Sequence, residues 1–289
     1  MLIKVVTDST SDLPEQVTRE LGVTIVPAYL QFGTETYRDR VNINENDFYE
    51  RLLRDPVHPT TEPPTPQDFA DTYRRLSQEA DAIISIHISS KLSATYNSAM
   101  RGKEIAEVNC PIEVVDSQLV TMGLGLLVLT ASSAVRSGKN LHEVMEEIRK
   151  TIPRIYMLGL FDTLKYLAQG GRIGKAKALL ASTLRVKPLL TMKDGEIEPA
   201  GHVRSRASGI DRLVDFVKDA VNIKNLAIVH STTLDEAHSL TERMLSMISK
   251  ERIILARLGP VLGVHGGPNA LFVAFQDSVS NEYSDLDSP

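Results

Sequence analysis

Hydroxyl side chains are concentrated in residues 89–99, a segment that includes Ser89, Ser90, Ser93 and Thr95. The apolar run 82–88 before it is typical of a buried parallel strand, and the spacing of apolar residues after it is typical of a helix. The segment is therefore expected to join the carboxyl end of a strand to a helix N-terminus, where ligands of open α/β sheets usually bind. Free backbone N–H groups there favour an anion. The Ser93 hydroxyl is placed either to cap the helix or to donate to an anion.

Other polar residues in loops extend this candidate site. His265 lies among glycines, where the backbone can approach a ligand closely, although a surface histidine would look the same. Thr60 and Thr61 lie in a loop that Pro59, Pro63, Pro64 and Pro66 make stiff and extended. Such a loop could present a hydroxyl rigidly to a ligand, or it could be an ordinary connector. Gly170-Gly171-Arg172 could belong to an anion site, but it fits a helix C-cap followed by a solvated cation equally well. Arg204 and Arg206 could likewise be an exposed cationic pair before a helix. These residues indicate only an anion-binding cleft between two α/β domains.

Several catalytic and cofactor motifs are missing. The sequence has no G-x-S-x-G turn for a serine nucleophile. Gly174-Lys175 resembles the end of a P-loop, but Gln169 and Ala176 replace the required glycine and hydroxyl residue. Seven scattered histidines and one cysteine, Cys110, argue against a metal site and exclude an intrachain disulfide. No catalytic residue is therefore assigned.

Composition predicts a cytoplasmic globular protein. The 289 residues are 42% hydrophobic and 24% charged, with a net charge of −5. This charge argues against nucleic acid or an anionic membrane surface as the main partner. The N-terminus lacks the layout of a signal peptide. The longest apolar stretch, residues 122–134, is too short and too interrupted to span a bilayer.

The pattern of elements predicts an α/β protein of two domains. Residues 1–151 alternate strands and helices, which indicates a doubly wound parallel sheet. Within it, Asp12 or Ser11 is expected to cap a helix that starts near Pro14, and Asn140 to cap a helix over 141–150. Residues 152–277 are expected to form a mixed-sheet α/β domain with a hairpin turn at Asp194-Gly195.

Three further segments complete this prediction. Residues 122–131 are apolar on every side and, as a helix, must be buried, either as a central core helix or along a cavity. Residues 258–269 read as a glycine-rich loop before the last strand. Residues 278–289 are polar and acidic and are predicted to be a disordered tail.

The ordered set of motifs resembles the DegV family, whose characterised members are fatty-acid-binding proteins, including the acyl-carrying subunit of bacterial fatty acid kinase. The likeness runs from Val6 to Ala274. It is carried by the segments 6–14, 89–99, 116–117, 162–167, 170–175 and 259–268.

The resemblance implies a two-domain carrier with one long-chain fatty acid, such as palmitate, buried inside it and no other cofactor. Ser93 and Thr61 would bind the carboxylate, His265 and Arg204 would lie close to it, and Arg172 would contact the kinase subunit. It also allows a transient contact with a membrane. Two departures weaken the match: residues 62–65 read Glu-Pro-Pro-Thr rather than Ser-Gln-Pro-Ser, and Asn269 replaces a glycine.

Physical chemistry is consistent with a carrier. Burial of an acyl chain contributes about 0.8 kcal/mol per CH₂, whereas the carboxylate must be paired or hydrogen-bonded to offset its loss of water. No nucleophile with an adjacent oriented base is apparent. Two alternatives remain open: a lipid hydrolase or acyltransferase that uses Ser93 with His265, and a sensor of small anions.

Overall fold

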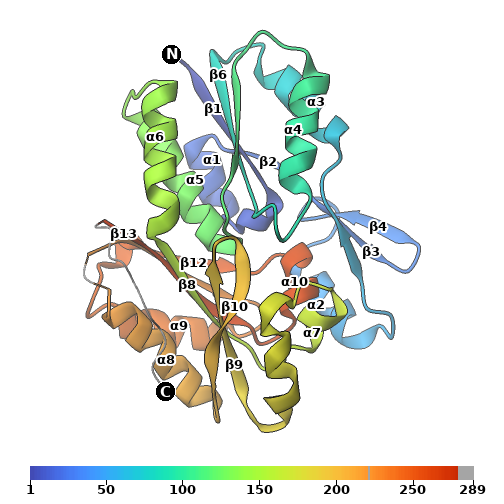
Figure 1. The fold of residues 1–289 in the computed structure, drawn as a ribbon, viewed down its shortest axis with the longest axis vertical. Coiled ribbons are helices and arrows are strands. Elements are labelled where there is room, and N and C mark those ends of the chain that lie inside the picture. The colour runs from blue at the N-terminus through green and yellow to red at the C-terminus, as the bar shows by residue number, and fades with distance from the viewer. Residues whose placement is uncertain (221, 279–289) are drawn as a thin grey trace.

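The N-terminal half forms the parallel sheet that the sequence predicts. A computed structural model describes residues 1–220 and 222–278 (Figure 1). Its first sheet has the order β2-β1-β6-β7, with every neighbouring pair parallel. The strands are β1 (Ile3–Asp8), β2 (Thr24–Val26), β6 (Ala82–His87) and β7 (Ile112–Asp116). All six residues of β6 are buried, as expected for a central strand that is covered on both faces.

Helices cover both faces of this sheet. They are α1 (Glu15–Leu21), α3 (Pro66–Leu76), α4 (Thr95–Ala106), α5 (Thr121–Arg136) and α6 (Leu141–Thr151). Asn140 caps α6, as predicted, in a capping box with Glu143. The predicted cap of α1 is wrong: its N-cap is Pro14, because Ser11 belongs to a short 3₁₀ turn and the Asp12 carboxylate binds Arg40 instead.

Helices α3 and α4 cross at Gly102, where a side chain has no room. A Cβ atom on Gly102 would lie 2.4 Å from the Phe69 Cβ and 2.8 Å from the Pro66 carbonyl oxygen, and neither atom can turn away. We expect Gly102→Ala to lower the free energy of unfolding by about 2 kcal/mol, since overpacking outweighs the gain in helix propensity. Urea unfolding measures this change.

Gly123→Ala is the matched comparison for Gly102→Ala. A Cβ atom there would meet the flexible end of Met157, 2.3 Å away at the sulfur, so the loss should be smaller. Equal stability of Gly102→Ala and the wild-type protein would contradict the prediction.

The C-terminal half forms the predicted mixed sheet, with the order β10-β9-β8-β13-β11-β12. Only β11 and β12 pair in parallel among these strands. The hairpin turn at Asp194-Gly195 is present, with positive φ at both residues. The strands are β8 (Ile155–Leu160), β9 (Lys187–Lys193), β10 (Glu196–Val203), β11 (Ile223–His230), β12 (Ile253–Arg257) and β13 (Leu271–Asp277). The helices of this half are α7 (Lys165–Gln169), α8 (Arg206–Lys218), α9 (Leu234–Met244) and α10 (Pro260–Gly266).

Two segments predicted as loops are regular structure. The proline-stiffened loop contains β5 (Thr60–Glu62), which joins a small antiparallel sheet with β3 (Tyr29–Phe32) and β4 (Glu35–Arg38), next to α2 (Glu45–Arg54). The glycine-rich loop contains α10, which begins with Pro260 at its first turn. Gly263 suits that helix because a Cβ atom there would lie 2.4 Å from the ring of Phe48.

One hydrophobic core joins the two halves. Helix α5 contacts β1 and β6 on one side and β8, β11 and β13 on the other. A single buried cluster accordingly contains residues of both sheets. Helix α5 is thus a central core helix, lying between the two sheets (Figure 1). The boundary after residue 151 remains a prediction, and the predicted acidic tail lies outside the described residues from 279 onward.

Within the described ranges, none of the helices combines the length and the apolar character that crossing a bilayer requires.

Candidate functional site

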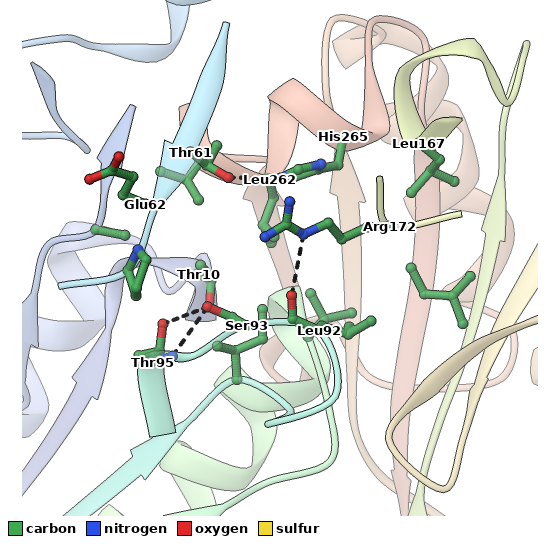
Figure 2. A pocket seen from close by; sticks show the side chains of 16 residues that line it. Thr10, Thr61, Glu62, Leu92, Ser93, Thr95, Leu167, Arg172, Leu262 and His265 are labelled. Carbon is green, nitrogen blue, oxygen red and sulfur yellow. Dashed lines mark hydrogen bonds between the residues drawn. The ribbon is translucent and has the colours of Figure 1, made fainter. Parts of the chain in front are cut away.

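A narrow pocket lies where the N-terminal sheet, the small sheet and the C-terminal half meet. Its cavity volume is about 60 Å³. One part of its wall is polar and consists of Thr10, Thr61, Glu62, Ser93, Thr95, Arg172 and His265 (Figure 2). The other part is apolar and consists of Ala28, Pro63, Ile88, Leu92, Val120, Leu167, Ile197, Val261 and Leu262. The pocket can therefore hold a polar group with an apolar one attached to it.

Ser93 precedes the N-cap of α4, which is Ala94 and has no side-chain cap hydrogen bond. Its hydroxyl accepts a hydrogen bond from the Thr95 backbone N–H (3.3 Å) at the start of α4, and it lies 2.8 Å from the Thr95 Oγ1. The same side chain lines the pocket. The contact with Thr95 does not, therefore, remove Ser93 from the site.

Thr61 and His265 meet from two elements that the sequence did not predict. The Thr61 Oγ1, on β5, is 3.0 Å from the His265 Nε2, on α10 (Figure 2). Burial lowers the pKa of His265 to about 4, with smaller contributions from Arg172 and His58, so the ring is neutral at pH 7.

The surroundings of His265 favour a proton on Nε2 over one on Nδ1. The Nδ1 atom is buried without a hydrogen-bond partner, and a buried N–H without a partner is rarer than an unpaired acceptor. His265 then donates to Thr61, which leaves the Thr61 hydroxyl hydrogen available to the pocket. The ring fits only because residue 170 is glycine: a Cβ atom there would be 2.1 Å from Nδ1.

The cation of the pocket is Arg172 and not Arg204. The Arg172 Nη1 donates to the Gly170 carbonyl (2.8 Å) and its Nε donates to the Leu92 carbonyl (3.4 Å), across the pocket mouth. Arg204 is exposed and does not line the pocket, which corrects our expectation. The reason is the direction of β10: Ile197 lines the pocket near the start of the strand, and seven further residues carry the chain roughly 20 Å away.

Thr10 is a pocket residue that was not expected from the sequence. Thr10 follows β1 just as residues 89–93 follow β6, and these two strands are parallel neighbours. Their carboxyl ends therefore meet at one edge of the sheet. The hydroxyl-rich sequence 7–11 was the available signal.

The structure does not pair the two residues of the hydrolase alternative. The hydrogen bond of His265 is made with Thr61, and that of Ser93 with Thr95. In the described part of the chain, no group of three or more His, Cys, Asp or Glu side chains is arranged to hold a metal ion.

Comparisons of sequence show the family. The family model described as "Uncharacterised protein, DegV family" matches residues 2–277. A DegV domain-containing protein of Caldanaerobacter subterraneus subsp. tengcongensis is 33% identical over 278 residues, which cover 95% of this chain and 99% of that protein. A DegV domain-containing protein of Deinococcus radiodurans is 34% identical over 279 residues, which cover 96% of this chain and 99% of that one.

Solved structures share the fold. A fatty-acid-binding DegV family protein of Thermus thermophilus has a TM-score of 0.88 and 34% identity, covering 96% of this chain and 100% of its own. DegV of Bacillus subtilis, a fatty acid binding protein, has a TM-score of 0.86 and 27% identity, covering 96% and 100%. A stearic acid-binding protein of Eubacterium ventriosum has a TM-score of 0.87 and 26% identity, covering 95% and 98%. With the family model matching nearly its whole length, the chain belongs to the DegV family.

Proposed function

We propose that this protein is a non-catalytic cytoplasmic carrier that binds a long-chain fatty acid and presents its carboxylate to a separate ATP-dependent kinase. The observation that carries the proposal is the divided wall of the pocket, with hydroxyls and a cation on one part and apolar side chains on the other. Fatty acid binding by the Thermus thermophilus and Bacillus subtilis relatives supports it.

The carboxylate is proposed to lie against Ser93 and Thr61, with Arg172 nearby. Thr61 has a free hydroxyl hydrogen because His265 donates to its oxygen. Hydrogen bonds to a charged group each contribute about 1.5–3 kcal/mol, and together they offset the loss of water from the carboxylate. His265 acts by orienting Thr61 and stays uncharged.

The acyl chain requires the apolar wall to open. A cavity of about 60 Å³ is far below the roughly 300–1,000 Å³ of pockets that hold drug-sized ligands. Leu92, Leu167 and Leu262 line the pocket and also belong to, or pack against, the core cluster around α5. That cluster contains Met122 and Met157, whose flexible side chains adapt to irregular spaces. We propose that the chain enters there, gaining about 0.8 kcal/mol per buried CH₂.

The proposed kinase would approach at the pocket mouth. Arg172 is exposed there and is the candidate contact with it. The absence of a Ser93–His265 hydrogen bond favours presentation of the acid over hydrolysis by this chain.

Native mass spectrometry of the protein purified from bacteria tests the proposal. An adduct with the mass of an intact fatty acid, confirmed by lipid extraction, is the expected result. Turnover of an ester that Ser93→Ala abolishes would instead establish the hydrolase, and a protein that binds small anions but no lipid would establish the sensor.

Arg172→Gln is expected to weaken fatty acid binding by about tenfold, since it removes one charged partner at the exposed mouth of the pocket. Fluorescence competition with dodecanoic acid measures the change. Arg204→Gln is the matched control, because Arg204 is exposed but lies away from the pocket. A larger loss in Arg204→Gln than in Arg172→Gln would restore Arg204 as the head-group cation.

A further inference from the structure

A chain of four buried polar side chains runs behind the pocket through the N-terminal half. The Tyr73 hydroxyl donates to the Ser85 Oγ (2.8 Å), which lies 2.7 Å from the His87 Nε2. The His87 Nδ1 lies 3.0 Å from the Asp8 Oδ2. All four side chains are fully buried, and none of them lines the pocket.

The Ser85–His87–Asp8 order is that of a nucleophile, a base and an orienting carboxylate, but its place in the fold excludes catalysis. Ser85 is completely buried between β1 and β7, where no substrate reaches it. The chain of hydrogen bonds does end at the pocket. The Asp8 Oδ1 accepts from the backbone N–H (3.0 Å) and the hydroxyl of Thr10, and its Oδ2 accepts from the Ile88 N–H (3.2 Å). Thr10 and Ile88 both line the pocket.

The hydrogen bonds fix where each proton lies. Asp8 receives four donors, so it acts as an acceptor throughout and the His87 proton is on Nδ1. The Nε2 atom must then accept from Ser85, whose oxygen accepts from Tyr73. The Thr10 hydroxyl hydrogen always points to Asp8. Thr10 therefore offers the pocket an acceptor only, unlike Thr61, whose hydroxyl hydrogen is free.

We propose that Asp8, held by His87, is a positioning residue that keeps Thr10 as the acceptor-only wall of the head-group pocket. This inference rests on the proposed function. An acceptor-only hydroxyl repels carboxylate oxygens, which directs the carboxylate toward the donors of Ser93, Thr61 and Arg172. A ligand with a hydroxyl hydrogen, in contrast, can donate to Thr10.

The test compares dodecanoic acid with 1-dodecanol, which share one alkyl chain length and differ in the head group. We expect the ratio of the alcohol Kd to the acid Kd to rise about fivefold in Thr10→Val, which removes the acceptor. Asp8→Asn should raise the ratio similarly, because its amide donates toward Thr10 and releases the Thr10 hydrogen. The ratio is the readout because a general loosening of the pocket weakens both ligands alike. If Asp8→Asn does not fold, Thr10→Val tests the acceptor and the His87 tautomer tests the role of Asp8.

Two controls separate this role from a structural one. Thr10→Ser keeps the hydroxyl and should leave the ratio unchanged within twofold. Asp116 at the end of β7 also binds a serine, through the N–H (3.1 Å) and the hydroxyl of Ser90 in the turn after β6, but Ser90 does not line the pocket. Asp116→Asn should therefore leave the ratio unchanged.

Nitrogen-15 NMR of labelled histidine gives an independent readout. The wild-type protein should show His87 protonated on Nδ1 and unprotonated on Nε2. The opposite tautomer, or an unchanged ratio in Thr10→Val with normal acid binding, would overturn this assignment alone. A wild-type protein that does not bind dodecanoic acid would overturn the proposed function and this assignment with it.

Discussion

The double variant Thr61→Val, Ser93→Ala is expected to bind a long-chain fatty acid about 100-fold more weakly than the wild-type protein. In the proposed complex each hydroxyl donates one hydrogen bond to the carboxylate, and loss of about 1.5 kcal/mol at each site is roughly tenfold in Kd. Valine has nearly the shape of threonine, so Thr61→Val removes the hydroxyl without opening a cavity. Fluorescence competition with dodecanoic acid measures the affinity, and 1-dodecanol should lose much less.

The three-residue strand β5 supplies the control for this experiment. Thr60 is exposed on the strand that carries Thr61 and does not line the pocket. Thr60→Val should therefore bind as the wild-type protein does. Equal losses in Thr60→Val and Thr61→Val would show that the strand, and not the hydroxyl, determines binding.

The fold could be predicted where periodicity was strong. The run 82–88 and the alternation around it sufficed for the parallel sheet, and Asp194-Gly195 sufficed for the β9–β10 hairpin. The small sheet was missed because Thr60 to Glu62 is too short to show alternation and is followed by prolines. Helix α10 was missed because its glycines oppose helix formation, and the close packing of Gly263 on Phe48 is visible only in three dimensions.

The candidate site was predictable in its residue types but not in its arrangement. Ser93, Thr61 and His265 were named from the sequence and family motifs, and the structure brings all three to one pocket. The sequence could not choose between two arginines, because that choice depends on which end of β10 faces the pocket. It also could not find the link from Tyr73 to Asp8, since these residues come from three segments of the chain.

Asp39 is expected to destabilise the folded protein at pH 8, and Asp39→Asn to stabilise it. Asp39 is only 2% exposed, and neither of its carboxylate oxygens has a hydrogen-bond partner of good geometry. Burial raises its pKa from 3.8 to about 7, although the nearby Arg40 and, more weakly, the Ser9 hydroxyl oppose the shift. The folded state therefore binds this proton more tightly than the unfolded chain. Asp39 lowers the free energy of unfolding progressively as the pH rises from about 4 to 7.

The expected change in the free energy of unfolding follows from the pKa shift of Asp39 and from the loss of a negative charge next to Arg40. A shift of about three pKa units corresponds to about 4 kcal/mol, and the substitution recovers only part of it because Arg40 loses a neighbouring charge. We expect Asp39→Asn to raise the free energy of unfolding by about 1–3 kcal/mol at pH 8 and by less than half of that at pH 5, where the folded-state carboxyl is still protonated. Urea unfolding at the two pH values measures both differences.

Asp12 provides the contrasting variant, because burial raises its pKa to about 6 but its oxygens are fully bonded. They accept from Arg40 (3.1 Å), the Gly259 N–H (2.9 Å) and the Thr121 hydroxyl (2.6 Å), and these bonds join the starts of α10 and α5 to the turn that follows β1. Asp12→Asn breaks these bonds and should destabilise the protein at pH 8. A loss of stability in Asp39→Asn at pH 8, or an equal gain at pH 5, would mean that attraction to Arg40 outweighs the burial of the Asp39 charge.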